Sequence, residues 1–111
     1  MYYELSKSQK KIARKVMDKG LDNHYRNGLD SAEKLIQKWK TDKLDNKDAY
    51  MELFKKIESI DKHIAGIYNG KGGSRWVEVM AYQLADGVIS TDDLNEFDVE
   101  VREVIMRVSG I

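Results

Sequence analysis

The chain lacks cysteine and proline and contains no long apolar run. Without cysteine it can build neither a thiolate metal site nor a disulfide framework, and it has no thiol nucleophile. No stretch reaches the roughly 18 apolar residues of a membrane span, and the residues that follow Met1 lack the apolar core of a signal peptide. We therefore expect a cytoplasmic protein with no membrane segment, and the sequence suggests no cofactor.

The remaining composition is that of a small folded domain. The chain has 111 residues, of which 41% are hydrophobic and 34% are charged. At this length, folding buries roughly two-thirds of the surface of the unfolded chain, which is enough for a core without metal ions or disulfides. We predict a single domain that spans residues 1–111.

The net charge of zero hides an uneven distribution along the chain. Residues 1–47 carry 12 basic and 7 acidic side chains (12 − 7 = +5), and residues 48–111 carry 7 basic and 12 acidic ones (7 − 12 = −5). Either one half docks electrostatically on the other, or the two ends meet partners of opposite charge. Docking of the chain on itself is the simpler of these interpretations.

Apolar residues recur at spacings of three and four, which predicts an all-α fold. The first helix should run from about Ser6 or Ser8 to about Thr41. It either breaks at Gly20 or continues, and we favour a continuous helix. Each interior glycine then costs about 1 kcal/mol relative to alanine, so a second helix should approach closely at Gly20 and Gly28.

The later elements follow from their capping residues. A polar connector at residues 42–47 precedes a second helix from Asp48 to Tyr68, with Asp45 and Asn46 as candidate N-caps. Ser74 should cap a third helix, residues 90–93 form a capping box, and a last helix follows Asp98. We predict a long antiparallel helical hairpin closed by about three shorter C-terminal helices, a small helical bundle. The expected core of the second helix is Leu53, Ile57, Ile60 and Ile64.

Two motif-like features overlap near the C-terminus. Residues 86–94 resemble the second half of an EF-hand calcium loop, but the first ligand positions fall on Tyr82 and Leu84, which cannot ligate a hard cation. We therefore predict no calcium binding. The same region has the layout of a helix-turn-helix, but its would-be recognition helix at residues 92–103 is strongly acidic and would be repelled by phosphates.

Two groups of residues are candidates for anion or nucleic-acid contacts. One arc of the first helix carries five basic side chains, which are Lys7, Lys10, Lys11, Arg14 and Lys15. The loop at residues 70–75 places Lys71, Ser74 and Arg75 at a helix N-terminus, where an anion can be held. A solvated helix face and an ordinary flexible connector are the simpler explanations.

Neither histidine lies in a catalytic or metal-binding spacing. His24 falls on the line of the first helix that contains Gly20 and Gly28, and His63 flanks the apolar stripe of the second helix. We therefore predict no catalytic, cofactor or metal residues and no enzyme. The most economical function is a protein-protein interaction or adaptor module, and the alternative is a nucleic-acid-binding protein that uses Lys7 to Lys15.

The partner is then an unidentified protein or a second copy of the chain. Ile12, Ala13, Val16 and Met17 need a cover, which the C-terminal helices or another copy could provide. The C-terminal helices offer Val101, Val104, Ile105 and Val108, so we favour a monomer over a homodimer.

Overall fold

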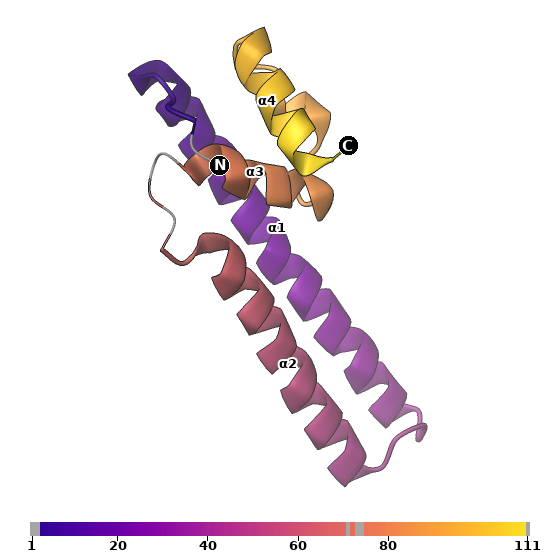
Figure 1. The fold of residues 1–111 in the computed structure, drawn as a ribbon. Helices are drawn as coiled ribbons and strands as arrows, with labels where there is room; N and C mark the ends of the chain where they lie inside the picture. The colour runs from indigo at the N-terminus through magenta and orange to yellow at the C-terminus, as the bar shows by residue number, and fades with distance from the viewer. Residues whose placement is uncertain (1–2, 71, 73–74, 111) are drawn as a thin grey trace. The chain divides into compact units, whose positions relative to one another are not determined.

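The computed structural model describes residues 3–70, 72 and 75–110. Within these residues the fold is helical and contains no strand. The elements are α1 (Lys7–Lys40), α2 (Asn46–Tyr68), α3 (Trp76–Ala85), the short 3-10 helix η2 (Thr91–Leu94) and α4 (Val99–Ser109) (Figure 1). The predicted all-α fold class with its long first helix is confirmed.

Helix α1 runs without a break through both of its interior glycines. Its 34 residues make it about 50 Å long. A Cβ at Gly20 would overlap the side chain of Gln83 on α3, and one at Gly28 would lie 3.1 Å from Ile60 Cγ2 on α2. The predicted close approaches at both glycines are confirmed, with α3 as the neighbour at Gly20.

Local hydrogen bonds explain where the helices end. After α1 the chain turns at Asp42, which has a φ of 60°. The Lys43 N–H donates to the Lys38 carbonyl (2.9 Å) and the Asp42 N–H to the Trp39 carbonyl (3.1 Å), which together form a Schellman motif. Asp45 then caps α2 through the Asp48 N–H (2.8 Å), as predicted.

The C-terminal caps also form as the sequence indicates. The Ser90 N–H donates to Asp93 Oδ2 at 2.8 Å in a capping box, and Gly110 ends α4 in the left-handed conformation (φ 78°). The predicted cap Ser74 lies outside the described residues.

The chain forms two compact units that share α1. The first comprises residues 1–23 and 67–111, and the second comprises residues 24–66. Whether the chain behaves as the single domain predicted from its length stays a prediction.

The first unit holds the main hydrophobic core. Met80, Leu94 and Ile105 are fully buried within it, and α3 packs against α4. Ala13 and Val16 belong to the same cluster as Val101, Val104 and Ile105 of α4. The predicted cover of the N-terminal turns by the chain's own C-terminal helices is therefore confirmed, whereas the oligomeric state stays a prediction.

Ion pairs in the first unit join its basic and acidic segments. Lys15 Nζ lies 3.4 Å from Glu96 Oε1, and Lys19 Nζ lies 2.6 Å from Asp93 Oδ1. These contacts agree with the interpretation that the two oppositely charged halves dock on one another.

The second unit is a thin hairpin of the later part of α1 and most of α2. The prediction that Leu53, Ile57, Ile60 and Ile64 form a core was wrong. Ile57 is 45% exposed, and the other three are half-buried. The physical reason is geometric, because within the hairpin a single neighbouring helix covers only part of the wide apolar stripe of α2.

Candidate functional site

The hairpin has two chemically different faces. Helix α1 meets α2 along a line, and the residues on either side of it follow from a rotation of about 100° per residue. Tyr25 and Leu29 of α1 lie on one side of this line, and Tyr50 and Phe54 of α2 lie on that same side. Large apolar side chains follow both helices on this side. We call this surface the apolar face and define it by Tyr25, Leu29, Ile36, Trp39, Tyr50, Phe54 and Ile57.

Most of the apolar face is open to solvent. Tyr50 and Leu29 expose 70% and 69% of their surface, and Phe54 exposes 57%. Isolated exposed apolar residues are common, but a contiguous patch of this kind marks an interaction site in most soluble proteins. The apolar face is therefore the strongest candidate for a functional surface in the hairpin.

A groove at the connector end of the hairpin is part of this face. It has a volume of about 310 Å³ and lies between Ile36 and Trp39 of α1 and Tyr50 and Leu53 of α2. The Trp39 indole N–H donates to Asn46 Oδ1 at 2.7 Å. This bond satisfies the polar atom of the indole and fixes its ring, so one wall of the groove is already ordered.

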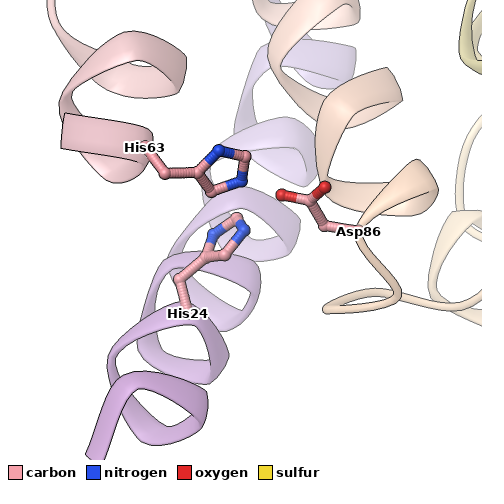
Figure 2. A group of neighbouring side chains, drawn as sticks. All are labelled: His24, His63 and Asp86. Carbon is pink, nitrogen blue, oxygen red and sulfur yellow. The ribbon is translucent and has the colours of Figure 1, made fainter. Parts of the chain in front are cut away.

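The opposite face of the hairpin is polar and carries the two histidines. A hollow of about 340 Å³ is lined there by Asn27, Ser31, Ser59 and both imidazoles, among others. Figure 2 shows His24 on α1 and His63 on α2. Their ring centroids lie 5.8 Å apart, and their ring planes make an angle of 77°. His24 is buried, as its position on the first helix predicted, and His63, which flanks the apolar stripe of the second helix, is exposed.

The meeting of the two histidines was not predicted from the sequence. In an antiparallel hairpin, opposing residues have nearly constant sums of their numbers. Trp39 and Asn46 give 85, Gly28 and Ile60 give 88, and the histidines give 87. This register between the two helices could have predicted the contact between the histidines from the sequence. Asp86, also labelled in Figure 2, belongs to the first unit, where it follows α3 and its N–H donates to the Tyr82 carbonyl at 2.9 Å.

Two of the five cations in the predicted basic arc on α1 make contacts within the chain, although both remain exposed. Arg14 stacks over the Trp76 ring with its guanidinium carbon 5.2 Å from the centroid, and Lys15 pairs with Glu96. Lys7 and Lys11 are exposed, and Lys10 is half-buried. Nucleic-acid binding through this arc stays a prediction, now with two of its five cations in contacts within the chain.

The predicted anion loop can be followed only at its last residue. Lys71 and Ser74 lie outside the described residues. Arg75 lies 3.4 Å from Glu78 Oε2, three residues further along the chain. Anion binding at this loop stays a prediction.

The segment that resembles half of an EF-hand is used as a helix start. Asp93 accepts hydrogen bonds from Lys19 Nζ (2.6 Å) and from the Ser90 N–H (2.8 Å). The bond from Lys19, followed by that from Ser90, lowers the pKa of Asp93 below its ordinary value. Tyr82 and Leu84, at the first ligand positions, lie within α3. The absence of calcium binding stays a prediction.

Comparison with known proteins gives no match to a family model, to a curated protein or to a solved structure. Among the described residues, no helix combines the length and the apolar character that are needed to cross a membrane.

Proposed function

We propose that the chain is a non-enzymatic interaction module whose hairpin pairs, through the apolar face, with the hairpin of a second copy. This proposal departs from the monomer favoured on the sequence, which was argued from the cover of the N-terminal turns and not from the hairpin. The single observation that carries this proposal is the run of large, exposed apolar side chains along one side of both helices. The other side of the same hairpin is polar, so the pattern is that of a helix pair with one side in an interface.

The structure of the hairpin itself suggests a second copy of the chain as the partner of the apolar face. Within residues 24–66, all of which the structure describes, only His24, Gly28, Ala32 and Ala49 are buried. Two helices do not enclose a core, whereas two such hairpins make a four-helix bundle that does. A two-fold axis would bring identical apolar faces together, because a symmetric dimer uses the same patch on both subunits.

Area and charge both permit this pairing. Tyr25, Leu29, Trp39, Tyr50, Phe54 and Ile57 are about half exposed, and side chains of this size have roughly 200 Å² of surface. They therefore supply about 600 Å² per copy, most of the roughly 800 Å² that each partner buries in a standard interface. Residues 24–66 carry nine basic and eight acidic side chains (9 − 8 = +1), so two hairpins repel each other little.

Mass in solution tests the proposal directly. Sedimentation velocity on the full chain should give twice the 12.8 kDa of one copy at high concentration and a shift towards one copy on dilution. Phe54→Glu places a charge in the centre of the apolar face and should leave only the 12.8 kDa species. Ser59→Glu puts the same charge on the polar face and should leave the dimer intact.

Circular dichroism tests whether the two variants remain folded. Both substituted side chains are exposed, so both variants should keep the wild-type helix content. A wild-type chain that remains monomeric at several hundred micromolar would overturn the proposal, and so would a dimer that Phe54→Glu leaves unchanged. If the wild-type chain is monomeric, the apolar face would need an apolar partner other than a second copy of the chain.

A further inference from the structure

We propose that His24 and His63 form a two-histidine site for a divalent transition-metal ion of the kind that prefers imidazole, such as Zn²⁺, Ni²⁺ or Cu²⁺. The site lies within the hairpin and uses one ligand from α1 and one from α2. It is independent of the proposed dimer, since the histidines lie on the polar face.

The distance between the rings suits a shared ion. One ring nitrogen of His24 lies within 4.8 Å of one ring nitrogen of His63. Zinc binds histidine nitrogen at about 2.0–2.1 Å, so two tetrahedral ligands have their nitrogens about 3.4 Å apart. The two nitrogens therefore need to approach by at most about 1.4 Å to share an ion.

The two ligands also differ in a useful way. His24 is 7% exposed and lies within the continuous helix α1. His63 is exposed on α2, so an ion can reach its ring from solvent. A ligand that is already buried lowers the ordering cost of binding, because its side chain is largely immobilised before the ion arrives.

The surroundings favour a transition metal over a hard cation. The hollow of about 340 Å³ beside the rings can hold an ion together with water ligands, and Asn27 and Ser59 offer oxygen atoms at its wall. Imidazole nitrogen is a ligand that Zn²⁺, Ni²⁺ and Cu²⁺ favour, whereas Ca²⁺ and Mg²⁺ favour sets of oxygen ligands. Lys56 lines the same hollow, but its long side chain can carry the ammonium group into solvent.

Titration of the untagged full chain tests the site. After dialysis against a chelator and then against buffer, Zn²⁺ and Ni²⁺ should each bind with one ion per chain and raise the melting temperature, because the ion links α1 to α2. Ca²⁺ and Mg²⁺ should do neither. His63→Gln should weaken Zn²⁺ binding about tenfold or more, since loss of a residue that merely orients a ligand costs roughly 10- to 100-fold.

Two further variants make the outcome decisive. Asp61→Asn, an exposed carboxylate on the same helix, is the matched control and should leave the affinity unchanged. His24→Gln should weaken binding as His63→Gln does, although its buried position can also alter folding. Zn²⁺ binding that is insensitive to His63→Gln would overturn the proposal, and so would the absence of any Zn²⁺ or Ni²⁺ binding at millimolar ion.

Discussion

Replacing Gly20 by alanine should destabilise the protein even though alanine is the better helix former. An added Cβ would overlap the Nε2 atom of Gln83 and lie 2.5 Å from its Cδ. Gln83 is fully buried, and its Nε2 donates to the Met17 carbonyl (3.0 Å) and to the Tyr68 hydroxyl (2.8 Å). The side chain therefore cannot move away without the loss of both bonds.

The expected magnitude follows from these contacts. Two lost hydrogen bonds cost about 1 kcal/mol each, and an amide left buried and unsatisfied costs about 1–3 kcal/mol more. The gain in helix propensity returns about 1 kcal/mol. The free energy of unfolding should thus fall by about 2–4 kcal/mol, which lowers the melting temperature by roughly 10–20 °C in a domain of this size.

Gly66→Ala is the matched control. It makes the same substitution inside a helix, but nothing lies within 4 Å of the new Cβ. It should raise the free energy of unfolding by up to about 1 kcal/mol. Thermal and urea unfolding measure both variants, and an unchanged or higher stability of Gly20→Ala would refute the close packing of α1 against Gln83.

Three further predictions concern the core, the capping box and calcium. Ile105→Ala, at a fully buried position, should cost about 2–5 kcal/mol in urea unfolding, whereas Ile57→Ala, 45% exposed, should cost less than about 1 kcal/mol; equal losses would contradict the assigned core. Because the folded pKa of Asp93 is lowered, its stabilisation is present above the unfolded pKa of about 3.9 and disappears as the pH falls through the folded pKa. Asp93→Asn should therefore reduce stability at pH 7 and much less near pH 2, and a loss that does not depend on pH would refute the ion pair. Added Ca²⁺ should leave the melting temperature unchanged, and micromolar binding in a calorimetric titration would contradict this.

The helix boundaries were readable from the sequence because they depend on neighbouring residues. Asp45, the capping box of Ser90 with Asp93, and Gly110 each act on backbone groups at most a few residues away. The continuity of α1 was a harder inference. It succeeded because glycine in a helix interior is costly, so its presence at Gly20 indicated a neighbour that needs the space.

The burial of α2 could not be read in the same way. Its apolar stripe shows that one side of the helix avoids water, but a stripe carries no information about what covers it. Ile57 and Phe54 belong to the amphipathic pattern of α2 and are nevertheless exposed. The meeting of His24 and His63 was missed for a related reason, since it requires the register between two helices.

Because α1 is shared by both units, one uninterrupted helix should show two rates of amide hydrogen exchange. Its first half includes Ala13 and Val16, which are anchored in the main core, so these amides are released only by global unfolding. Its second half, with Leu29 and Trp39 open to solvent, should exchange through local opening in a monomer. The position along α1 at which protection falls would show where the cooperative core ends, and protection extending to Lys40 would indicate that something covers the hairpin in solution.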